Sequence, residues 1–158
     1  MLIMLVEKDI APKFTLLDQG GQKQSLSAQK GKWVLIYFYP KDDTPGCTKE
    51  ACTIAEVYND FSKMGVTVFG VSKDSVASHK KFADKYSLPF SLLSDEEGKV
   101  IEAYGAWKEK SMFGKKYMGI NRISYLINPK GKVEKVYPKV SPATHALDIL
   151  KDLKSLIN

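Results

Sequence analysis

Arginine is almost absent from this sequence of 158 residues, because all but one of its 24 basic residues are lysines. The single arginine, Arg122, lies within residues 119–127, a stretch that otherwise has the composition of a strand. A guanidinium stays charged at any working pH and presents a rigid fork of donors, which a lysine does not. We therefore expect Arg122 to have a specific task, with a structural ion pair or an accident of composition as the alternatives.

Cysteine and histidine are also scarce. The two cysteines are Cys47 and Cys52, and the two histidines, His79 and His145, are isolated from them and from each other. A structural zinc site needs about four ligands, so this set disfavours one. We expect His79 to lie on the solvent-facing side of a helix, and His145 to be packed or to cap a helix near its start.

The chain has no apolar run long enough to cross a membrane. Residues 1–6 are apolar, but they are too few for a transmembrane helix. They also lack the basic region and the small-residue cleavage site of a secretory leader. We therefore expect a cytoplasmic protein with no membrane association, whose thiols are reduced at rest.

Long blocks of one charge are missing as well. The formal net charge is +6 and the pI is about 9.1, but the 24 basic residues are interspersed with 18 acidic ones. Such a distribution is typical of solvated lysines on amphipathic surfaces, so we do not expect nucleic-acid binding. The alternative, a basic nucleic-acid-binding module, would show a steep dependence of affinity on salt.

Repeats, low-complexity stretches and linkers are absent, which favours one domain over residues 1–158. Strands alternate with helical segments, which predicts an α/β fold. The order of the elements resembles a thioredoxin-like sheet with an N-terminal hairpin and additional insertions. The strands are expected at 14–17, 24–26, 33–39, 66–71, 90–93, 120–128 and 132–137. The helices are expected at Cys47–Met64, Ser75–Tyr86, Glu97–Tyr104 and Pro142–Ile157.

Both cysteines fall where the strand at 33–39 passes into the first of these helices. Backbone N–H groups and the dipole at a helix start favour an anion, and this environment turns a thiol into a thiolate nucleophile. Arg122, on a strand of the same sheet, could bring its guanidinium to Cys47 and stabilise charge on a departing oxygen. The Thr44 hydroxyl could donate to one substrate atom and accept from another, while Pro40 restricts the loop. Together, these groups would allow the Cys47 thiolate to attack an O–O bond.

The spacing of the cysteines adds a constraint. In an unbroken helix, residues five apart have Cα atoms about 8–9 Å apart, whereas a disulfide needs less than about 7 Å. A bridge between Cys47 and Cys52 therefore requires the first turns of the helix to unwind.

Other interpretations of the two thiols remain open. They could be small core residues, although positions five apart on a helix do not share one face. They could also belong to a thiol–disulfide oxidoreductase that acts on proteins, but such enzymes usually separate their cysteines by two residues rather than four. A redox-sensing interaction module is a further alternative.

Several motifs resemble the peroxiredoxin family, and most closely its bacterioferritin-comigratory-protein, or Q-type, branch. The most specific are Pro40-x-x-x-Thr44-x-x-Cys47, the run 44–52 that ends at Cys52, and Arg122 two residues before the strand 124–127. The resemblance continues at residues 11–16, 93–95, 104–105 and 142–145, so that it covers nearly the whole chain. It departs from the family at Lys8, where glycine is common, and this position concerns a turn.

The resemblance implies a thioredoxin-like fold with Cys47 as the peroxidatic and Cys52 as the resolving cysteine. Thr44 and Arg122 would bind and polarise the peroxide, Gly46 would belong to the substrate-binding loop, and Pro40 would shield the pocket. It further implies that the substrates are hydrogen peroxide and organic hydroperoxides, and that thioredoxin or a similar dithiol protein recycles the enzyme. It also implies a protein without haem, flavin or metal that is a monomer or weak dimer.

Two interpretations remain open for Glu50 and for residues 107–116. Glu50 either complements the helix dipole or orients Arg122. Residues 107–116, with Trp107, Phe113 and four lysines, form either a rim for a partner or substrate or an ordinary covering loop.

Overall fold

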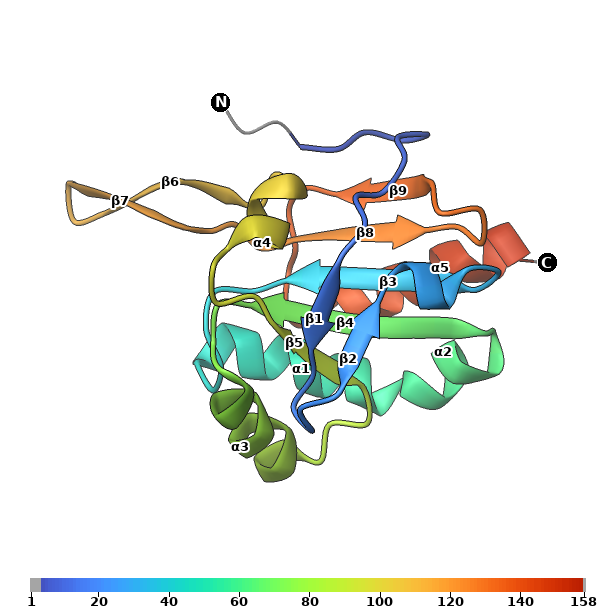
Figure 1. Cartoon of the computed structure of the whole chain (residues 1–158), viewed down its shortest axis with the longest axis horizontal. Helices are drawn as coiled ribbons and strands as arrows, with labels where there is room; N and C mark the ends of the chain where they lie inside the picture. The colour runs from blue at the N-terminus through green and yellow to red at the C-terminus, as the bar shows by residue number, and fades with distance from the viewer. Residues whose placement is uncertain (1–3, 158) are drawn as a thin grey trace.

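The computed structural model describes residues 4–157, in which a seven-stranded sheet runs through the middle of the molecule (Figure 1). Its strands are β1 (Thr15–Leu17), β2 (Lys23–Ser25), β3 (Trp33–Phe38), β4 (Val66–Ser72), β5 (Ser91–Ser94), β8 (Ile123–Ile127) and β9 (Val133–Tyr137). They lie in the order β2-β1-β5-β4-β3-β8-β9. The pairs β5–β4 and β4–β3 are parallel, and the other pairs are antiparallel.

The two strands nearest the candidate site, β3 and β8, are almost entirely buried. Strands covered on both faces of a sheet are continuously apolar rather than alternating, as the sequence Trp33–Phe38 is. Successive side chains of β3 enter different cores: Leu35 and Tyr37 pack on one face of the sheet, and Val34 and Ile36 on the other.

Four helices cover the first of these faces: α1 (Pro45–Glu56), α2 (Tyr58–Lys63), α3 (Val76–Tyr86) and α5 (His145–Ile157). The other face is covered by α4 (Lys99–Ala103), by the segment that precedes β1 and by residues next to the 3₁₀ helix η1 (Ser27–Gln29). Within residues 4–157, no helix combines the length and the apolar character that a membrane span requires.

Most predicted elements are confirmed, but three predicted helices have clearly different bounds. The helix expected at Glu97–Tyr104 is shorter and spans Lys99–Ala103. The helix expected over Cys47–Met64 begins at Pro45 and is divided at Val57, whose φ of −108° and ψ of 12° lie outside the helical range. The Val57 N–H closes a tighter turn onto the Ile54 carbonyl. The last helix begins at His145 rather than Pro142, because residues 142–144 form a turn closed by the Ser141 carbonyl.

Residues 107–116, expected to form a loop, belong instead to a hairpin arm, formed by β6 (Trp107–Met112) and β7 (Lys115–Ile120). It projects from the body of the molecule (Figure 1). Phe113 and Gly114 both have positive φ, 52° and 78°, as a two-residue type I′ turn requires. The strand predicted from Ile120 accordingly begins at Ile123, after the arm has ended.

Lys8 occupies a backbone position of the glycine type. Its φ is 77°, and its N–H donates to the Val133 carbonyl at 2.8 Å. A lysine in this left-handed conformation is strained relative to glycine. The left-handed backbone is the physical reason that glycine suits this turn, and Lys8 adopts the same conformation with more strain.

Candidate active site

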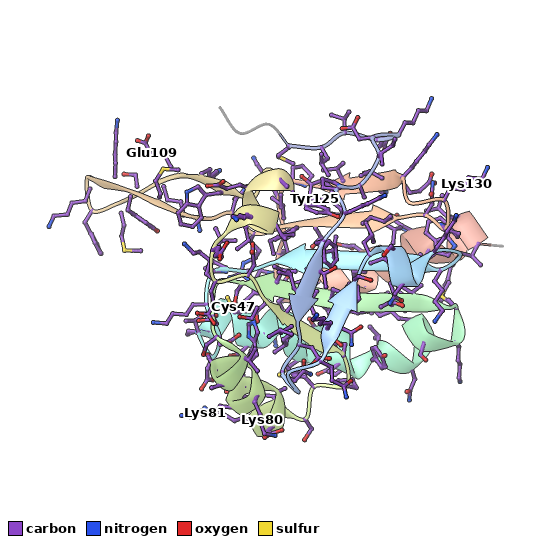
Figure 2. The ribbon with its side chains drawn as sticks, in the orientation of Figure 1. Cys47, Lys80, Lys81, Glu109, Tyr125 and Lys130 are labelled. Carbon is purple, nitrogen blue, oxygen red and sulfur yellow. The ribbon has the colours of Figure 1, made fainter. Side chains whose placement is uncertain are left out.

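Cys47 is the third residue of α1, directly after the loop that leaves β3 (Figure 2). Pro45 occupies the first helical position, where its fixed φ suits the helix and its missing N–H costs nothing. The Cys47 side chain is buried, with 2% of the residue exposed. Its sulfur therefore lies at a helix N-terminus, where orphan N–H groups and the helix dipole stabilise a negative charge.

Arg122, in the segment between β7 and β8, divides its guanidinium between two residues of α1. Its Nη2 donates to Cys47 Sγ at 3.2 Å, and its Nη1 donates to Glu50 Oε1 at 2.7 Å. The arginine side chain is 20% exposed, so it remains partly accessible to solvent. The long-range contact predicted between the one arginine and Cys47 is therefore present.

Glu50 is the partner that holds the other arm of this fork. It is fully buried, and burial raises the pKa of its carboxyl to about 7 against the opposing effect of the Arg122 guanidinium. Its Oε2 has no hydrogen-bond partner among the described residues. Of the two interpretations of Glu50 left by the sequence, orientation of Arg122 is the one that this contact supports.

Gly46 makes room for the guanidinium. A Cβ atom added at this position would lie 3.1 Å from Arg122 Nη2, which is closer than ordinary van der Waals contact. Any larger residue would therefore press on the atom that donates to the sulfur. This contact gives the glycine a packing reason of its own.

The other residues predicted for the substrate loop lie close by but make different contacts. Thr44 caps α1 with extended backbone, and its Oγ1 donates to the Lys41 carbonyl at 2.9 Å rather than to Cys47 or Arg122. Pro40 follows β3 after one residue, and both Pro40 and Thr44 are half-buried.

Cys52 lies on the same helix, half-buried, and both thiols are free. Burial raises the pKa of the Cys52 thiol, the nearby Glu56 carboxylate raises it further, and Lys49 acts in the opposite direction. Because α1 is continuous from Pro45 to Glu56, the two cysteines are in the arrangement for which helix geometry forbids a bridge.

The prediction for His79 is wrong. Its side chain is completely buried, because α3 turns His79, Phe82 and Ala83 toward the sheet. His145 is packed as expected: it is buried, its Nε2 lies 2.8 Å from Ser124 Oγ, and burial lowers its pKa to about 4.

Of the two interpretations of residues 107–116, the hairpin arm contradicts that of an ordinary covering loop. Phe113, at its tip, is 98% exposed and covers nothing. Trp107, at its base, is half-buried under Lys73, whose Nζ lies 4.7 Å from the ring centroid. The sequence did not single out Lys110, a half-buried residue of β6. Burial lowers its pKa, and the Arg122 charge lowers it further.

Comparisons with known proteins agree with this geometry. Residues 8–136 match the family described as the AhpC/TSA family. The chain is 47% identical to peroxiredoxin Bcp of Escherichia coli over 146 residues, covering 92% of this chain and 94% of that protein. It is 44% identical to peroxiredoxin Bcp of Bacillus subtilis, with 92% and 93% covered.

Solved structures extend the likeness to the fold. The bacterioferritin comigratory protein of Xanthomonas campestris, whose structures were described for its alkyl peroxide reduction activity, superposes with a TM-score of 0.90. It is 38% identical, with 100% of both chains covered. Peroxiredoxin Q of the same organism gives a TM-score of 0.90 at 39% identity, covering 98% of this chain and 99% of that one. The predicted thioredoxin-like fold is confirmed, and the chain belongs to the AhpC/TSA family as a thiol-dependent peroxidase of the bacterioferritin-comigratory-protein, or peroxiredoxin Q, type.

Proposed function

We propose that Cys47 is the peroxidatic nucleophile of this enzyme, and that the guanidinium fork of Arg122 is what activates it. One arm of the fork is on the sulfur and the other is fixed by buried Glu50, so the charge is held in place before substrate arrives. A preorganised donor of this kind needs no reorganisation as charge develops in the transition state. This contact is the single observation that carries the proposal.

The chemistry follows from a thiolate held in that position. The Cys47 thiolate attacks the terminal oxygen of a hydroperoxide, an S–O bond forms as the O–O bond breaks, and the alkoxide or hydroxide leaves and takes up a proton. Cys47 is then a sulfenic acid. Arg122 stabilises the departing oxygen, and Gly46 leaves space for its guanidinium. Thr44 binds the peroxide once its hydroxyl turns from the Lys41 carbonyl. Pro40 limits access of water.

Cys52 then resolves the sulfenic acid. Its thiol displaces the hydroxyl group from the Cys47 sulfur, which forms the intramolecular disulfide and releases water. A dithiol reductant restores both thiols. We propose that this reductant is thioredoxin or a similar dithiol protein, and that the enzyme works as a monomer or weak dimer in the cytoplasm, where thiols are kept reduced. Nucleic acid and membrane are not partners in this proposal, because the basic residues are interspersed with acidic ones and form no block.

Intact mass spectrometry tests the route directly. After one equivalent of hydrogen peroxide and denaturing alkylation, we expect the loss of two alkylatable thiols within one chain. Dithiothreitol should restore both. If two thiols remain free after minutes at micromolar peroxide, Cys47 is not activated. That result would favour the alternative function, a protein thiol–disulfide oxidoreductase.

Formation of the disulfide should unwind α1. We expect the oxidised protein to lose helical circular-dichroism signal equivalent to roughly two turns, and its amides in residues 46–56 to exchange faster, because the two Cα atoms must approach within about 7 Å. Cys52→Ser treated with peroxide is the control, since it is oxidised at Cys47 without a bridge. Identical exchange across residues 46–56 in both redox states would rule out the unwinding.

A further inference from the structure

The loop that joins β3 to α1 is attached to the body of the molecule by a buried acid–histidine pair. This loop carries Pro40 and Thr44 and ends at the helix start that holds Cys47. Asp42, near its middle, is 8% exposed, and His79 of α3 is fully buried. Asp42 Oδ2 lies 2.7 Å from His79 Nδ1. Neither residue touches Cys47 or Arg122 through a hydrogen bond in the described structure.

The hydrogen-bond partners of His79 determine where its protons are. Nε2 lies 2.9 Å from the Leu93 carbonyl oxygen, which can only accept, so Nε2 carries a hydrogen. Nδ1 faces an oxygen of Asp42 at 2.7 Å, and two lone pairs would repel each other at that distance. A second proton therefore lies between Nδ1 and Oδ2, which makes this an acid–imidazole pair with both ring nitrogens engaged.

The remaining contacts of Asp42 complete the attachment. Its Oδ1 accepts from the Tyr39 hydroxyl at 2.6 Å, and its Oδ2 also accepts from the Ser78 hydroxyl at 2.8 Å. Its backbone N–H donates to Asp74 Oδ2 at 2.9 Å, so the side chain and the main chain are both held. A buried polar network in which every member is satisfied is rigid, and removing one member leaves the others unpaired.

Asp42, Asp74 and His79 also have the residue types of a metal site. The structure gives their contacts a simpler explanation. A separation of 2.7 Å between Nδ1 and Oδ2 is that of a charge-assisted hydrogen bond, and the other nitrogen already donates to a carbonyl. A proton and not a cation joins the pair.

The next residue ties the loop to the far end of the same helix. Asp43 has a φ of 55°, a left-handed conformation, and its two carboxylate oxygens accept from Lys85 Nζ at 2.8 Å and from the Tyr86 hydroxyl at 2.9 Å. Consecutive aspartates thus fasten the loop to both ends of α3. The helix α3 supplies no residue to the site itself, so it serves as a platform.

We propose that Asp42 and His79 are positioning residues of the peroxidase: their buried pair holds the loop of Pro40 and Thr44 on α3 and thereby places the peroxide. The charge at Cys47 is set separately, by Arg122 and the helix start. The inference rests on the proposed role of Thr44 as a peroxide-binding residue. It predicts that breaking the pair damages the reaction with peroxide and spares the intrinsic reactivity of the thiolate.

Hydrogen peroxide and iodoacetamide distinguish the placement of the peroxide from the intrinsic reactivity of the thiolate. Hydrogen peroxide must be bound and aligned by the loop, whereas iodoacetamide needs only an accessible thiolate. With Cys52→Ser as the common background, we expect His79→Gln to slow oxidation of Cys47 by hydrogen peroxide about 10- to 100-fold, as a misplaced binding group would. Alkylation by iodoacetamide should stay within about twofold of the parent, because Arg122 and the helix start still hold the thiolate.

The chain offers matched variants for this experiment. His79→Asn keeps a neutral donor near Nδ1 and should recover part of the peroxide rate. Ser75→Ala removes the cap of the same helix, where Ser75 Oγ accepts from the Ser78 N–H at 3.1 Å, without touching Asp42. It should lower thermal stability and leave both rates unchanged. If His79→Gln does not fold, Ser78→Ala and Tyr39→Phe each remove one bond to Asp42 and should give smaller losses in the same direction.

The outcomes are distinct. An unchanged peroxide rate in His79→Gln, or equal losses with peroxide and iodoacetamide, would overturn the positioning role. A parent protein that alkylates rapidly but does not react with peroxide would overturn the proposed function instead.

Discussion

Replacing Cys47 with serine is expected to abolish peroxide turnover, with a loss of about 10⁴-fold or more. The serine hydroxyl has the shape of the thiol, but it does not ionise near neutral pH, so the helix start and Arg122 have no anion to hold. Peroxide consumption supported by dithiothreitol measures the effect without requiring a protein reductant. A folded Cys47→Ser protein that still consumes peroxide would contradict the assignment.

Cys52→Ser is the matched control, because it makes the same atomic change five residues away. Without an added thiol, it should consume one peroxide per chain at the normal rate and then stall, because the chain offers the sulfenic acid no second thiol. With excess peroxide, Cys47 should progress to the sulfinic acid, a mass increase that intact mass spectrometry detects. If Cys52→Ser were inactive in the first attack and Cys47→Ser were not, the two roles would be exchanged.

The chemical core of this site could be predicted because its signals are local or compositional. A strand, a short loop that ends at the N-cap Thr44, and a cysteine in the first turn of the next helix follow one another in sequence. Each has a short-range physical cause. Arg122 is 75 residues from Cys47, yet it stands out because every other basic residue is a lysine. Its position next to β8, the sheet neighbour of β3, then brings it to α1.

The parts that could not be predicted depend on tertiary contacts or on unusual turns. His79 has a histidine's ordinary polarity, and only the packing of α3 against the sheet shows that it is buried beside Asp42. The arm escaped prediction because Phe113-Gly114 is not a usual hairpin dipeptide and its strands bury little. The division of the helix at Val57 depends on backbone angles that its apolar periodicity does not indicate.

Arg122→Lys is expected to slow the attack of Cys47 on peroxide by about 10²-fold, although it conserves the positive charge. The guanidinium donates to Cys47 Sγ and to Glu50 Oε1 from two different nitrogens. An ammonium is a point charge on a flexible stem, and it cannot reproduce this geometry at both atoms. A lysine drawn to buried Glu50 would leave the sulfur without its donor, and a lysine drawn to the sulfur would leave Glu50 with neither oxygen paired.

Stopped-flow measurement of Cys47 oxidation gives the rate constant directly, and Lys110→Gln separates geometry from charge. Lys110 is half-buried near Arg122 and makes no hydrogen bond to Cys47 in the described structure. Its replacement removes a positive charge and keeps the fork, so we expect a change of only a few fold. If Arg122→Lys kept full activity while Lys110→Gln lost it, net positive charge near the sulfur would be sufficient. In that case, the presence of one arginine among 24 basic residues would have no catalytic explanation.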